Sequence, residues 1–113
     1  MSVTISSENY TAAVEQAVNV VLLDVWAPGC QPCRIIEPMV AELEQTFAGR
    51  LTVAKLNADD EPDLTARLGV TGLPTLRLVR GGQVVFESRG VLEKAKLAEA
   101  ITTALAGTAG AAA

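Results

Sequence analysis

Stretches typical of β-strands alternate along this chain with stretches typical of α-helices, and that alternation restricts the folds it can adopt. Apolar runs of strand length lie at 3–5, 20–25, 51–56, 75–79 and 84–87. Apolar residues at helical spacing mark the intervening stretches, at about 7–18, 32–48, 62–68 and 92–105. The order predicts an α/β fold, in which a central mixed sheet of about five strands is flanked on both faces by about four helices.

Details of these stretches predict which side chains form the core. Val20 to Val25 is apolar except for Asp24, which is typical of a central strand buried on both faces. Gly81-Gly82 between the last two strands predicts a hairpin. In the first helix, helical spacing places four apolar residues on one face, namely Tyr10, Val14, Ala17 and Val18. The apolar stripes of the two other longer helices are expected to face inward; they comprise Ile35, Ile36, Met39, Val40, Leu43 and Phe47, and then Leu97, Ile101 and Leu105.

The length of the chain fits one domain with a single hydrophobic core, since it has 113 residues. We assign residues 1–106 to this domain. Residues 107–113 are small and have nothing predicted to pack against, so we expect a flexible C-terminal tail. Nothing in the sequence indicates an assembly larger than a monomer.

Charge and hydropathy narrow the classes of partner. The net charge is −4 and no basic cluster is present, which argues against nucleic acid or an anionic membrane as a partner. Residues 1–33 contain no Lys or Arg, so the basic start of a secretory signal is missing. The longest apolar run, Val18 to Trp26, is too short to cross a bilayer. We therefore expect a soluble, cytoplasmic protein.

The chain contains two cysteines, Cys30 and Cys33, and no histidine. In a reducing compartment a lone disulfide is more often catalytic than structural, and a loop of about four residues stabilises the fold by only ~2 kcal/mol on the loop-entropy model. The lack of histidine excludes Ser-His-Asp and Cys-His catalysis and His-ligated metals. Two thiolates cannot complete a tetrahedral zinc site, so only a four-cysteine site shared by a dimer remains open, and we predict no metal.

Over residues 3–106 the chain resembles the thioredoxin family. The resemblance rests on six pieces of sequence: Asp-Val-Trp-Ala at 24–27, Cys-Gln-Pro-Cys-Arg at 30–34, Pro38, Leu-Thr-Val-Ala-Lys-Leu-Asn at 51–57, Gly-Leu-Pro-Thr at 72–75, and Gly90. It implies a thioredoxin fold with a redox-active Cys-x-x-Cys. Two positions depart from the familiar pattern, because Gly29 replaces a tryptophan and Gln31 replaces a glycine.

The resemblance and the local chemistry together give four residues a role in catalysis. Cys30 is the expected nucleophile, because the N-terminus of a helix favours a thiolate. Cys33, about one turn further and more buried, is the expected resolving thiol. Asp24 is expected to have a raised pKa and to accept the Cys33 proton, unless it merely caps nearby backbone at a strand end. Lys55 on the neighbouring strand is expected to limit that shift, unless it only extends to solvent.

The remaining site residues concern the binding of a client protein. By resemblance Pro74 is a cis-proline facing the cysteines, whereas the sequence alone fits a trans-proline that starts a strand. The Leu73 backbone is expected to pair with an extended client segment. Trp26 either shields the site or belongs to the core. The other expected binding residues are Gly29, Gln31, Gly90 and Val91.

The expected function is that of a protein disulfide reductase that maintains redox homeostasis through the Cys30/Cys33 dithiol and disulfide. The resemblance implies two kinds of partner, disulfide-containing client proteins and a thioredoxin reductase that uses NADPH or a ferredoxin-linked equivalent. No bound cofactor is expected beyond the disulfide itself. The alternatives are a thiol oxidant or isomerase, a non-catalytic binding subunit of the same fold, and a structural disulfide domain. Pro32 and the missing signal sequence disfavour the first, and an intact Cys30, Cys33 and Asp24 disfavour the second.

Overall fold

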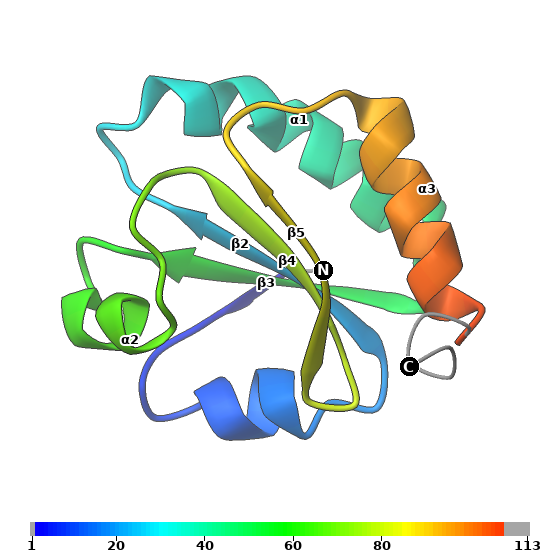
Figure 1. Ribbon diagram of the computed structural model, residues 1–113, viewed down its shortest axis with the longest axis horizontal. Coiled ribbons are helices and arrows are strands. Elements are labelled where there is room, and N and C mark those ends of the chain that lie inside the picture. Colours follow the sequence, from blue (N-terminus) through cyan, green and yellow to red (C-terminus); the bar gives the residue numbers. More distant parts are fainter. Residues whose placement is uncertain (1, 108–113) are drawn as a thin grey trace.

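The computed structural model describes residues 2–107 and contains one five-stranded mixed sheet between two helical layers (Figure 1). The strands are β1 (Ser2–Thr4), β2 (Val20–Trp26), β3 (Leu51–Asn57), β4 (Thr75–Arg80) and β5 (Gln83–Arg89), in the spatial order β1-β3-β2-β4-β5. The helices are η1 (Thr11–Glu15), α1 (Gln31–Thr46), α2 (Pro62–Arg67) and α3 (Lys94–Leu105). The predicted α/β class and element order are confirmed. The predicted flexible tail lies, apart from Gly107, outside the described residues.

Strand β2 occupies the centre of the sheet because almost every one of its side chains can be buried. It pairs in parallel with β3 and antiparallel with β4. Side chains of successive strand residues point to opposite faces, so Val20 and Leu22 contribute to one core and Val21 and Leu23 to the other. Asp24 follows Leu22 by two residues, so its side chain points to the same face of the sheet as Val20 and Leu22.

Each face of the sheet is covered by its own pair of helices. Helices α1 and α3 supply Ile36 and Ile101, among others, to the core that contains Leu22. Helix η1 and helix α2 supply Val14 and Leu64 to the core on the opposite face. Figure 1 shows the two pairs on opposite sides of the strands. None of the helices between residues 2 and 107 is long and apolar enough to cross a membrane.

Two predictions about the core are wrong. The first helix was predicted to run to about residue 18 with Val18 on its apolar face, but η1 ends at Glu15 and Val18 is fully exposed. Once the helix ends, helical spacing no longer sets the direction of the side chain. Ile35 was predicted to face inward, yet it is 64% exposed. The buried positions of α1 are Cys33, Ile36, Val40 and Leu43, and Ile35 lies about 100° around the helix from Ile36.

Candidate redox site

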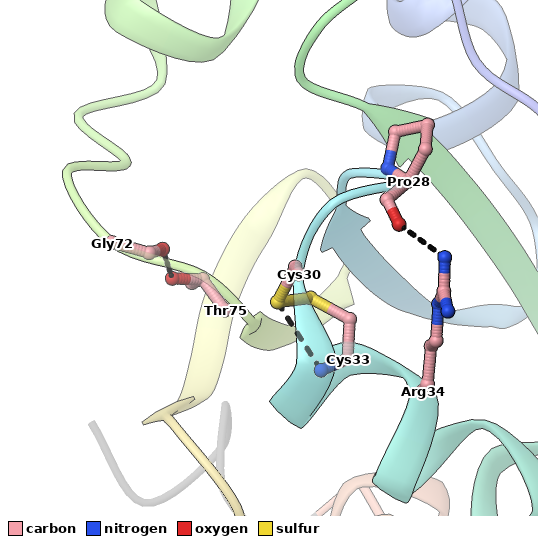
Figure 2. Close-up of a disulfide and its surroundings, with 6 residues drawn as sticks. All are labelled: Pro28, Cys30, Cys33, Arg34, Gly72 and Thr75. Carbon is pink, nitrogen blue, oxygen red and sulfur yellow. Dashed lines mark hydrogen bonds between the residues drawn. A yellow bond between two sulfur atoms is a disulfide. The ribbon is translucent and has the colours of Figure 1, made fainter.

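A disulfide joins Cys30 to Cys33 at the start of helix α1, so the structure is that of the oxidised protein (Figure 2). The two Cα atoms are 5.3 Å apart. Cys30 is the N-cap of α1, and its Sγ accepts a hydrogen bond of 3.2 Å from the backbone N–H of Cys33. Cys33 is buried with 5% exposure, whereas Cys30 is partly exposed. This is the expected difference between an attacking and a resolving sulfur.

The position of Cys30 favours a thiolate in the reduced protein. The first backbone N–H groups of a helix have no partner within the helix, and the aligned peptide dipoles leave this end positive. Both effects stabilise a negative charge on Cys30 Sγ, which lowers the pKa of a thiol at such a position. Cys33 lies within the first turn of the helix and is buried.

An arginine contact holds the loop that leads into this helix. Arg34 donates a hydrogen bond of 2.7 Å from Nη2 to the carbonyl oxygen of Pro28, two residues before Cys30 (Figure 2). The side chain therefore ties the first turn of α1 back to the loop after β2. Sequence reasoning missed this contact, because no residue spacing encodes a bond to a loop carbonyl.

The pairing of the strands brings three loops to the edge of the sheet where the disulfide lies. Val25 near the end of β2 is paired with Thr75 at the start of β4, and Thr75 is paired with Arg89 at the end of β5. The loops at 27–30, 71–74 and 90–93 therefore leave the sheet at the same edge. Figure 2 shows Gly72 and Thr75 on the Cys30 side of the disulfide.

Hydrogen bonds fix the second and third of these loops. Thr75 donates from Oγ1 to the carbonyl oxygen of Gly72 at 2.7 Å, and the N–H of Gly90 donates to the carbonyl oxygen of Pro74 at 2.9 Å. The Leu73–Pro74 peptide is cis, as the resemblance implied. Pro74 itself is buried and Leu73 is partly buried.

Asp24 is a buried carboxylic acid on the helix α1 side of the sheet. It is 4% exposed, and its Oδ1 accepts no hydrogen bond from any residue between 2 and 107. Burial raises the pKa of Asp24 from its ordinary 3.8 to about 6. The charge of Lys55 lowers this pKa, and the charge of Glu37 raises it by a smaller amount. The predicted elevation of this pKa is present.

Lys55 is paired with Asp24 in the register of β2 and β3, but its ammonium binds a different carboxylate. Its Nζ lies 3.0 Å from Oε1 of Glu37, a residue on α1 that sequence reasoning missed. The signal was present, because Glu37 follows Cys33 by four residues and such residues share a helix face.

The remaining predicted residues differ in how far they reach solvent. Val91 is 55% exposed, Gly29 and Gln31 are exposed, and Trp26 and Gly90 are partly buried. A Cβ atom added to Gly29 would have no neighbour within 4 Å, so a larger side chain at this position would extend into open space. Among residues 2–107, no group of three or more acidic, cysteine or histidine side chains is arranged to hold a metal ion.

Comparison with known proteins yields one consistent family. A family model described as Thioredoxin matches residues 1–103. Thioredoxin of Haemophilus influenzae is 40% identical over 97 residues, which cover 86% of this chain and 91% of that protein. Thioredoxin of Synechocystis is 41% identical over 81 residues, with 72% and 76% covered. Thioredoxin 2 of Chlorobaculum tepidum is 33% identical over 94 residues, with 83% and 86% covered.

Proposed function

This chain belongs to the thioredoxin family, and we propose that it reduces disulfide bonds in client proteins through the Cys30/Cys33 pair. Family membership together with the disulfide makes it a thiol–disulfide oxidoreductase. One observation supports the proposal above the others: the disulfide caps a helix, and the partly exposed sulfur is the one that accepts a backbone N–H. That sulfur is Cys30, the better nucleophile and the one that a client can reach.

Two exchange steps carry two electrons from the dithiol to the client. The Cys30 thiolate attacks one sulfur of the client disulfide, so a Cys30–client bond forms and the other client sulfur leaves as a thiolate that takes up a proton. Cys33 then loses its proton and attacks Cys30 Sγ. The Cys30–Cys33 disulfide forms, and the second client sulfur leaves as a thiolate and is protonated in turn.

Asp24 is the proposed acceptor of the Cys33 proton. A general base works best when its pKa lies near the operating pH, and burial brings the pKa of Asp24 to about 6. The carboxylate is buried on the α1 side of the sheet, the side to which the buried Cys33 also belongs. Lys55 is proposed to keep this pKa from rising further, because a nearby cation favours the carboxylate.

The three loops at the edge of the sheet, with the adjoining ends of β2 and α1, form the proposed binding surface for clients. An extended client segment can pair with the backbone of Leu73, and Pro74 has no N–H of its own to compete for the client's carbonyls. Exposed Val91 supplies apolar contact area. The proposed surface consists of Trp26, Gly29, Gln31, Leu73, Gly90 and Val91.

Regeneration of the dithiol requires two electrons from another donor, because each reduced client leaves the Cys30–Cys33 disulfide behind. We propose a thioredoxin reductase that draws on NADPH, and a monomer that works in the cytoplasm with no nucleic-acid or membrane partner. The surface that binds clients is proposed to bind the reductase as well, since both must reach Cys30.

The direction of electron flow is tested by equilibrating the pair against a thiol buffer of known potential. A value near about −270 mV, which is typical of thioredoxins, supports the reductase role, and a value at or above about −180 mV, as in protein disulfide isomerase, would overturn it. In an assay in which dithiothreitol regenerates the dithiol, Cys30→Ser is expected to abolish catalysed reduction of a protein disulfide. Cys33→Ser is the matched control, because it removes the resolving sulfur and is expected to trap a Cys30–client disulfide.

A further inference from the structure

Lys55 is the strand partner of one carboxylic acid, Asp24, and forms an ion pair with another, Glu37. Asp24 and Lys55 are register partners on β2 and β3, and both follow the alternation of residues in the α1-side core, such as Leu22 and Val53. Glu37 extends from α1 and places Oε1 3.0 Å from the Lys55 Nζ. Glu37 is 56% exposed and Lys55 is 26% exposed, so the ion pair lies at the outer edge of the site while Asp24 stays buried.

We propose that Glu37 is a positioning residue of the redox site, which holds the Lys55 ammonium toward the surface and thereby controls how readily Asp24 takes and releases a proton. The inference rests on the proposed proton-transfer role of Asp24 and extends it to a residue that touches neither sulfur. The Glu37 carboxylate contacts the ammonium and not the buried acid, so beyond the small direct effect of its charge it acts on Asp24 through Lys55.

Few other charges face Asp24. Leu76 of β4 lies directly opposite it and is apolar. On α1 the neighbouring cysteines do not titrate while they form the disulfide. On α3, which covers the same face, Lys94 is engaged with Glu42 of α1 at 3.4 Å. Lys55 and Glu37 are the two charged groups that shift the pKa of Asp24 beside its burial, and they act in opposite directions.

Replacement of Glu37 by glutamine has two effects on Asp24, and both have the same sign. It removes a negative charge that opposes ionisation of Asp24, and it releases the ammonium to approach Asp24. Each effect lowers the pKa of Asp24. The fold itself should tolerate the change, because exposed ion pairs contribute little to stability.

The test is a carbon-13 NMR titration of the Asp24 carboxyl group in the disulfide form, between pH 4 and 9. The chain has no histidine, so the side chain that ordinarily titrates near pH 6 is absent. Glu37→Gln is expected to lower the titration midpoint from that of the parent protein. Glu42→Gln removes an exposed ion pair of the same helix and is the matched control, with an unchanged midpoint expected. A midpoint in Glu37→Gln equal to or above that of the parent would overturn the inference.

A second variant separates positioning from simple charge. Lys55→Met is expected to raise the midpoint, and in that background Glu37→Gln is expected to have a much smaller effect than in the parent. An undiminished effect would show that Glu37 acts by its charge alone, and the positioning role would then be wrong.

The same variants separate this inference from the proposed function. If Asp24→Asn leaves the pH dependence of client reduction unchanged, the proton-transfer role of Asp24 fails, whatever the NMR midpoints are. If the Asp24→Asn profile changes but Glu37→Gln moves neither the midpoint nor the pH profile, the inference about Glu37 fails by itself.

Discussion

Asp24→Asn should stabilise the oxidised protein against unfolding at neutral pH. At low pH the stability of the variant should be close to that of the parent protein. Burial disfavours the carboxylate, so the folded protein binds the Asp24 proton more tightly than the unfolded chain does. The side chain is 4% exposed, and solvent screening therefore weakens this effect little. Asparagine has a similar shape and carries no charge at any pH.

The expected magnitude follows from linkage between protonation and folding. The pKa is about 6 in the folded protein and 3.8 when unperturbed, and at about 1.36 kcal/mol per pH unit this difference amounts to about 3 kcal/mol. Because the folded-state pKa is the higher one, the unfolded state binds fewer protons between the two values. The free energy of unfolding therefore falls as the pH rises from about 4 to about 6, and it levels off above that range.

The assay is urea unfolding of both oxidised proteins at several pH values between 4 and 8. The free energy of unfolding of Asp24→Asn minus that of the parent should rise by roughly 2–3 kcal/mol across this range. A difference between two pH values removes any pH-independent effect of the new amide group, such as an unsatisfied N–H. A stability difference that stays constant from pH 4 to 8 would refute the assignment of a raised pKa to Asp24.

Four further substitutions test other parts of the structure by urea unfolding. Gly90→Ala should lower the free energy of unfolding by about 1–2 kcal/mol, because φ is +83° there while no contact blocks a Cβ. The control is Gly29→Ala, which has free space and no positive φ and should lower it by less than about 0.5 kcal/mol. Equal losses in the two variants would contradict this account. Arg34→Ala should cost about 1 kcal/mol through loss of the bond to Pro28, and no loss at all would mean that the contact does not hold the loop in solution. Leu22→Ala should cost about 2–5 kcal/mol, since Leu22 is fully buried, and a cost below about 1 kcal/mol would argue against the central place of β2.

The order of elements could be predicted from sequence because hydrophobic periodicity decides it locally. An unbroken apolar run such as Val20 to Val25 is compatible with few environments other than the centre of a sheet, and β2 is found there. Where an apolar stripe is wider than the surface it packs against, the same signal fails. Ile35 and Val18 are apolar and at helical spacing, yet neither contacts the core, because α1 buries a narrower stripe and η1 ends early.

The site was predictable only as far as its residues carry unusual chemistry. Cys30, Cys33 and Asp24 stand out because a thiol pair and a carboxylate in an apolar strand need an explanation in any fold. The contacts of Arg34 with Pro28 and of Lys55 with Glu37 do not stand out, since each joins ordinary surface residues whose distance is set by how α1 lies on the sheet. Sequence reasoning assigned Lys55 to Asp24 alone and missed the competing carboxylate.

Asp24 links the stability of this protein to its chemistry. At neutral pH the carboxylate costs the fold about 3 kcal/mol by the linkage above, which is a sizeable share of the 5–15 kcal/mol that typically stabilises a domain. An apolar side chain would fit the same strand without that cost, as its neighbours Leu23 and Val25 show. A residue that breaks the local rules of a central strand is therefore best explained by a function such as the proposed proton transfer from Cys33. The ion pair of Lys55 with Glu37 deepens the cost, because it holds outside the core the cation that would otherwise relieve it.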